Sequence, residues 1–200
     1  MQTMMNPGIP RVIARKEGRA LLNPEYKTLY HRRALAAGPV TAQTLLFFRD
    51  FTAATALDTN MTVPGQIPKP YEFSCFGVSL FVDQGTIAAD WHRLLNESVF
   101  FLRLSDKDKL QEPLHMIPSA GGLTGFADGI VAPAPAVTEM VNGLPMPTNF
   151  FPVSVQGRPV HFASGQTFQA TIQTFNAVAF TAAINLFVHL HGIYYIPMGS

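Results

Sequence analysis

Two histidines near the C-terminal end of the chain have the spacing of a metal site. His189 and His191 are separated by one residue, so on a β-strand both imidazoles point to the same face and can bind one ion. A cupin-like, metal-dependent enzyme would add a carboxylate nearby, but Glu139 is the last acidic residue. His115, His161 or an earlier acid would have to complete the ligand set. We therefore expect no metal and no cofactor, and we interpret the pair as packed or interfacial residues.

Other groups that could carry chemistry give no reaction either. Cys75 lies within an apolar stretch, where a thiol behaves as a small hydrophobic side chain, and a single cysteine excludes an internal disulfide. The Gly-rich residues 121–125 are not followed by the Gly-Lys-Ser/Thr of a phosphate-binding loop. A Gly-x-Ser-x-Gly nucleophile motif is absent. The sequence predicts a protein that is not an enzyme.

Charge divides the chain into two parts. Residues 1–33 hold seven basic and two acidic side chains, a net charge of +5, whereas residues 34–200 hold seven basic and eleven acidic ones, a net charge of −4. We expect a basic N-terminal arm over residues 1–40, partly helical or extended, with a short helix at 26–37. The arm would contact a neighbouring subunit or nucleic acid; the alternative is a solvated N-terminus. The basic residues expected to make these contacts are Arg11, Arg15, Lys16, Arg19, Lys27, Arg32 and Arg33.

The composition of the remaining chain favours β-structure. The 200 residues include 16 Phe, 16 Pro and 15 Gly, which is typical of short extended segments joined by turns. One amphipathic helix is expected at 86–96, a charged turn at 107–112, and a bulge at Gly192. Strands are expected at 44–51, 72–82, 98–104, 114–117, 150–155, 158–162, 166–175 and 183–196.

These elements predict a mainly β fold, an antiparallel β-sandwich or jelly-roll barrel of about eight strands with one inserted helix after the arm. Residues 41–200 would form this domain, and a barrel of another topology is the alternative. The Gly/Pro-rich loop at 118–148 is expected to be functional or part of an interface. Only 14% of the residues are charged, which favours a homo-oligomer that covers apolar surface. The chain contains no apolar run long enough to span a bilayer.

A basic arm followed by Phe-rich strands with one inserted helix, as in FSCFGVSLFVDQGTIAADWHRLLNESVFFLRL, resembles the jelly-roll structural proteins of viruses, especially bacteriophage capsid proteins. The resemblance implies a capsid or capsid-associated subunit without enzymatic activity. Such a subunit is made in the host cytoplasm, resides in the virion and contacts other virion structural proteins. One alternative is a carbohydrate- or receptor-binding β-sandwich that uses the 118–148 loop with Trp91, Tyr194 or Tyr195. Another is a cupin-like enzyme that uses His189 and His191.

Overall fold

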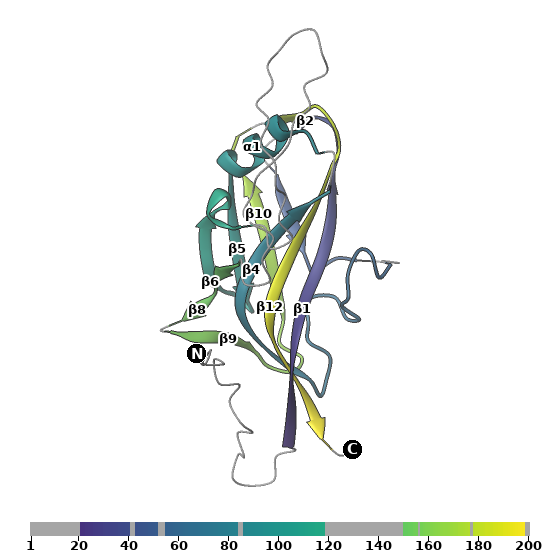
Figure 1. Ribbon diagram of the computed structural model, residues 1–200, viewed down its shortest axis with the longest axis vertical. Helices are drawn as coiled ribbons and strands as arrows, with labels where there is room; N and C mark the ends of the chain where they lie inside the picture. The colour runs from purple at the N-terminus through teal and green to yellow at the C-terminus, as the bar shows by residue number, and fades with distance from the viewer. Residues whose placement is uncertain are drawn as a thin grey trace, which may run out of the picture.

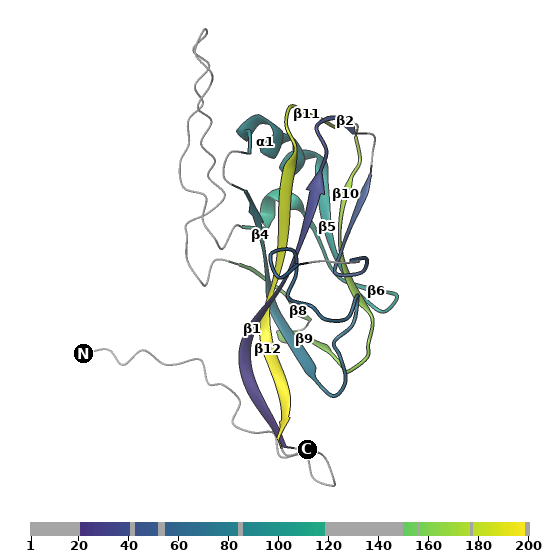
Figure 2. The same ribbon diagram turned by 90° about the vertical axis from the view of Figure 1, so that its right-hand side faces the viewer.

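A computed structural model of the chain describes residues 21–40, 43–51, 55–83, 86–118, 150–155, 157–176 and 178–198. These residues form a mainly β structure with two larger antiparallel sheets, one short two-stranded sheet and one α-helix (Figure 1). The two larger sheets lie against each other, with β1, β12 and β4 on one side and β10, β5 and β6 on the other (Figure 2).

The larger sheet has six strands in the order β1-β12-β4-β9-β8, with β7 also pairing with β4. Its strands are β1 (Leu21–Leu35), β12 (Ile184–Met198), β4 (Glu72–Val82), β9 (Arg158–Phe162), β8 (Ser154–Val155) and β7 (Phe151–Pro152). The longest pairing joins β1 and β12 along all fifteen residues of each strand. This pairing brings the N-terminal and C-terminal ends of the described chain together.

The second sheet has four strands in the order β3-β10-β5-β6. Its strands are β3 (Thr44–Phe47), β10 (Phe168–Thr174), β5 (Ser98–Leu104) and β6 (Lys107–Pro113). The remaining elements are the β2 (Gly38–Val40) and β11 (Val178–Phe180) pair, the helix α1 (Ala88–Glu97) and the 3-10 turn η1 (Leu114–Met116). They lie outside the two larger sheets.

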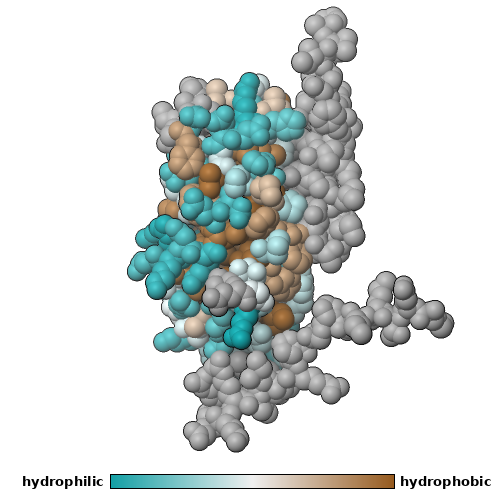
Figure 3. Space-filling model, turned by 90° about the vertical axis from the view of Figure 1, so that its left-hand side faces the viewer, coloured by the Kyte–Doolittle hydropathy of each residue, from teal (hydrophilic) through white to brown (hydrophobic). Residues whose placement is uncertain are grey.

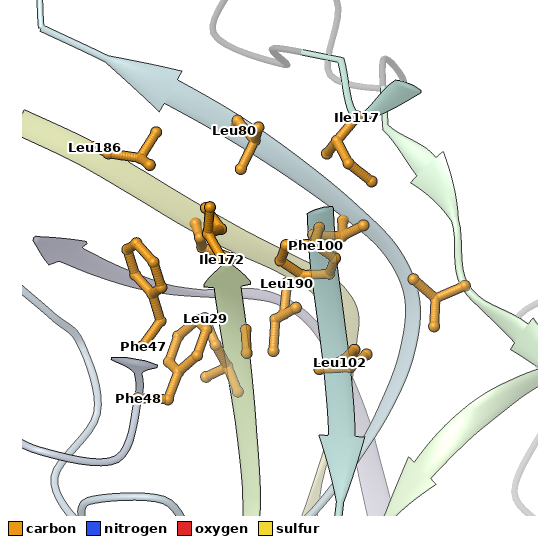
Figure 4. Close-up of a cluster of buried hydrophobic side chains, with 14 of the residues drawn as sticks. Leu29, Phe47, Phe48, Leu80, Phe100, Leu102, Ile117, Ile172, Leu186 and Leu190 are labelled. Carbon is orange, nitrogen blue, oxygen red and sulfur yellow. The ribbon is translucent and has the colours of Figure 1, made fainter. Parts of the chain in front are cut away.

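One hydrophobic core lies between the two larger sheets. Leu80 and Leu190 reach into it from the six-stranded sheet and meet Phe100 and Ile172 from the four-stranded sheet (Figure 4). All four side chains are fully removed from solvent. Burial of such side chains supplies about 1.5–3 kcal/mol each, so contact between the sheets is the main source of stability.

Several strand predictions are confirmed. The strands predicted at 72–82, 98–104 and 158–162 have the observed bounds of β4, β5 and β9, and the helix predicted at 86–96 is α1. The register of β12 against β4 shifts between His191 and Gly192, which confirms the predicted bulge.

The helix predicted at 26–37 is wrong, because these residues belong largely to β1. Along this strand Leu29, His31 and Leu35 are buried on the core side, while Tyr26 and Tyr30 alternate with them on the other face. That alternation has a period of two, and pairing with β12 selects it over the helix. The described part of the predicted arm is therefore a strand of the larger sheet, and residues 1–20 lie outside the described part of the chain.

Two smaller predictions after β5 are also wrong. The charged segment predicted as a turn at 107–112 is the strand β6, which follows a tight turn at Ser105 and Asp106. Charged side chains are common on such edge strands, because they oppose pairing with other chains. The strand predicted at 114–117 is the turn η1, in which Leu114 and Ile117 share one buried side at a spacing of three.

Candidate functional site

The histidine pair lies on β12, on the face of the six-stranded sheet that points away from the core. Along this strand the alternate residues Ile184, Leu186, Val188 and Leu190 are buried in the core, so the histidines between them point outward. Their ring centroids are 6.3 Å apart. The predicted common orientation of His189 and His191 is therefore confirmed.

Hydroxyl groups occupy both ring nitrogens of His191. Its Nε2 lies 2.8 Å from the Ser79 hydroxyl oxygen of β4, and its Nδ1 lies 3.2 Å from the Thr28 hydroxyl and 3.3 Å from the Tyr26 hydroxyl of β1. One nitrogen accepts and the other donates, because a neutral imidazole has one of each. A metal ion would have to displace one of these hydrogen bonds.

Burial keeps both histidines neutral. Loss of hydration lowers the pKa of His191 to about 4, and it lowers the pKa of His189 to about 4 with a further contribution from the neighbouring His191. Both imidazoles are therefore uncharged at neutral pH.

The residues considered as a third ligand are engaged elsewhere or exposed. His161 lies on β9, where its Nε2 is 3.3 Å from a Glu72 carboxylate oxygen and its Nδ1 is 3.1 Å from the Ser74 hydroxyl. His115 is exposed in η1. Among the residues that the structure describes, no three His, Cys, Asp or Glu side chains gather where they could hold a metal ion.

Aromatic rings surround the histidine pair and were not foreseen from the sequence. The Phe150 ring stacks on His191 with centroids 5.4 Å apart, and Phe187 lies 6.2 Å from His189. Gly77 of β4 makes room for the Phe150 ring, because a Cβ atom at this position would lie 2.2 Å from its Cδ2. The alternation along β12 could have indicated Phe187, but the contact with Phe150 joins residues 41 positions apart in the sequence.

The basic residues of β1 interact within their own chain. The Lys27 Nζ lies 4.3 Å from the centroid of the Tyr194 ring. Arg32 forms a 2.5 Å ion pair with Asp58, and the Arg33 Nε donates a 2.8 Å hydrogen bond to the Leu46 carbonyl. These three side chains stabilise the fold around β1. The other predicted arm residues, Arg11, Arg15, Lys16 and Arg19, lie outside the described residues.

Cys75 is fully buried in β4, and its thiol lies 3.4 Å from the Gly77 carbonyl oxygen. Burial raises the pKa of this thiol to about 12. The thiolate, which is the reactive form, is therefore nearly absent at neutral pH.

The aromatic residues proposed to contact a carbohydrate are mostly inaccessible. Trp91 is fully buried on α1, which contradicts its predicted role as a ligand contact. Tyr194 is also buried, and its ring stacks on Tyr71 at 5.3 Å. Tyr195 is half-buried. Apart from Pro118, the loop expected at 118–148 lies outside the described residues.

No protein-family model, curated protein or solved structure matches this chain. Within the described ranges, no helix has the length and apolar character needed to cross a membrane. The strand order and the contacts above are therefore the basis for a functional proposal.

Proposed function

We propose that the two larger sheets form a jelly-roll β-sandwich. The eight principal strands in chain order are β1, β3, β4, β5, β6, β9, β10 and β12. The first pairs with the eighth, the second with the seventh, the third with the sixth and the fourth with the fifth. This nested order is what results when one long antiparallel ribbon wraps into two facing sheets, as in a jelly roll.

We propose that the protein is a structural subunit of a virion, a capsid or capsid-associated protein that assembles through this β-domain. The nested strand order is the observation that carries the proposal, since jelly rolls occur in viral capsids, lectins and cupins. A fold alone does not define a function, so the contacts within it must discriminate among these classes.

The contacts favour the structural class over the other two. A cupin-like enzyme needs open imidazole nitrogens, whereas both nitrogens of His191 are hydrogen-bonded. A carbohydrate-binding module needs exposed aromatic rings, and of the rings predicted to contact a carbohydrate Trp91 and Tyr194 are buried. Apolar side chains appear among hydrophilic ones in the middle of the face shown in Figure 3, and contact between subunits would cover such areas.

The native mass of the purified full chain tests this proposal. Light scattering after size-exclusion chromatography, with electron microscopy of the same fractions, is expected to find large particles built of many copies. A folded chain that remains monomeric at high concentration would contradict the proposal. Stoichiometric metal that is lost in the His189→Gln, His191→Gln double variant would instead favour the enzyme.

The basic segment at residues 1–20 provides a separate test of the genome contact. If this segment binds nucleic acid, particles of the full chain should carry nucleic acid that is released steeply as salt increases. Particles of a variant that lacks residues 1–20 should carry less. Equal nucleic acid content in both particles would show that these residues have another partner.

A further inference from the structure

The ends of β1 and β12 form a two-stranded ribbon that projects beyond the rest of the structure (Figures 1 and 2). We define the terminal ribbon as Leu21–Asn23 paired with Ile196–Met198. The strand β4 accompanies β12 only as far as Tyr195, so beyond that residue the two strands continue alone. A stretch of two paired strands without a third has little stability of its own, so contact with another surface would stabilise this ribbon.

An apolar groove of ≈ 270 Å³ lies at the base of the terminal ribbon. It opens between the ribbon and the loop that precedes β4. Its floor and walls include the side chains of Leu29, Met61, Ile67, Tyr71, Tyr194 and Ile196. This groove continues the core side of the sheet to a region that the four-stranded sheet does not cover.

Two opposite charges accompany the groove. Glu25 and Lys27 both line it and are two residues apart on β1, so their side chains share one face of the strand. Glu25 is exposed, and Lys27 is partly covered by its contact with Tyr194. The face therefore presents an acid and a base in sequence along one strand, beside apolar side chains.

The free edge of β1 is poorly suited to pairing with another strand. The Asn60 side chain accepts a 3.0 Å hydrogen bond from the Tyr30 N–H and donates a 2.7 Å bond to the Thr28 carbonyl, so a side chain occupies this edge. The backbone N–H and C=O groups of the even-numbered residues of β1 point to this edge. Pro24 is one of these residues and has no N–H group to donate. A partner at the base of the ribbon would therefore contact its groove face rather than extend the sheet at the edge of β1.

We propose that the groove, with Glu25 and Lys27 beside it at the base of the terminal ribbon, binds the same surface of a second copy of this chain. A two-fold axis between Glu25 and Lys27 would place each carboxylate opposite the other copy's ammonium group, as a self-complementary interface requires. The pairing would cover the apolar groove of both copies at once. This inference goes beyond the proposed function, because such a dimer contact does not require a closed shell.

Charge reversal at the two positions tests the contact. Glu25→Lys gives a copy with two basic groups on this face, and Lys27→Glu gives a copy with two acidic groups. Each variant alone should dimerise about tenfold or more weakly than the natural chain, since like charges then face each other. An equimolar mixture should regain dimers, because each basic face meets an acidic one. Sedimentation over a concentration series measures all four samples, and circular dichroism checks that they are folded.

A matched control separates this contact from general charge attraction. The controls are Lys109→Glu and Glu112→Lys on β6, at half-exposed positions in the four-stranded sheet. They change the net charge by the same amounts as the two test variants. These control variants should dimerise like the natural chain. Unchanged dimerisation of the Glu25 and Lys27 variants, or failure of their mixture to regain dimers, would overturn the inference.

A second measurement uses the unmodified chain. A carbodiimide that couples carboxylates directly to amines should join Glu25 of one copy to Lys27 of another. A mixture of isotope-labelled and unlabelled chains identifies links between copies by mass spectrometry. Absence of mixed-label links between these positions would contradict the proposed arrangement. If the chain forms these dimers but no particles, only the virion proposal is contradicted. If particles form and the charge reversals at Glu25 and Lys27 do not affect their assembly, only this inference is contradicted.

Discussion

Acidification should destabilise this protein through three histidines, of which His31 and His191 are buried and His189 is half-buried. Burial lowers the pKa of His31, His189 and His191 from 6.5 to about 4, and the Arg33 charge adds to the effect at His31. The unfolded chain therefore takes up protons at a higher pH than the folded chain. The stability that depends on neutral imidazoles is complete above pH 6.5 and is lost as the pH falls toward 4.

The size of the effect follows from these pKa values. A fall from pH 7 to pH 4.5 protonates each histidine in the unfolded chain but leaves most of it neutral in the folded chain. The unfolding free energy then falls by roughly 2 kcal/mol for each histidine. The sum over the three histidines, about 6 kcal/mol, is an upper limit. At His31 the cost has a visible structural origin, because Nδ1 accepts a hydrogen bond from the Phe48 N–H and would lose this role if protonated.

Urea unfolding at several pH values between 4.5 and 7 measures this dependence. His31→Asn keeps an acceptor near Nδ1 but cannot take up a proton. The unfolding free energy of this variant should therefore rise less steeply with pH than that of the natural chain. The difference between the two slopes should be at most about 1.4 kcal/mol per pH unit. The matched control is His92→Gln, where the imidazole is exposed and hydrated in both states. Equal slopes in His31→Asn and in the natural chain would refute the reasoning.

Three further predictions concern single side chains. Gly192→Ala should destabilise the fold by about 1–3 kcal/mol in urea unfolding, since the new Cβ would lie 2.3 Å from the Phe73 ring; an unchanged unfolding midpoint would contradict this prediction. Asp90→Ala should lower the unfolding free energy by about 1–3 kcal/mol, measured as a lower melting temperature. The buried Asp90 carboxylate accepts hydrogen bonds from the backbone N–H groups of Thr181 and Ala182, just before β12. The Cys75 thiol should resist a thiol reagent in the native protein and react after denaturation; rapid native reaction would show that its strand opens.

The strands that could be predicted are those in which local pattern and tertiary environment agree. In β10 the apolar residues Phe168, Ala170 and Ile172 alternate with polar ones, and the structure buries that apolar face. The bulge at Gly192 could also be predicted from a glycine within a strand pattern, and here the Phe73 ring and the Ser74 carbonyl exclude a side chain. In both cases the short-range signal reflects the final packing.

The elements that could not be predicted depend on distant partners. The segment around Tyr30 contains good helix formers, and only its pairing with β12, about 160 residues away, makes it a strand. The contacts of His191 depend on the same long-range pairing, because Ser79 and Thr28 come from strands on either side of β12. The spacing of the two histidines could be seen in the sequence, whereas the hydroxyl groups that form hydrogen bonds with the ring nitrogens of His191 could not.

The position of β12 has a consequence for how the chain is made. It lies between β1 and β4 in the larger sheet, so until residues 184–198 have been synthesised β1 lacks its neighbouring strand and β4 lacks one of its two sides of pairing. A ribosome adding about 5–20 residues per second needs on the order of ten seconds to proceed from β4 to β12. During that interval the unfinished chain exposes strand edges that attract other chains. Because translation makes β12 last, there is a period in which newly made copies must be kept apart. That period ends only when β12 pairs with β1 and β4.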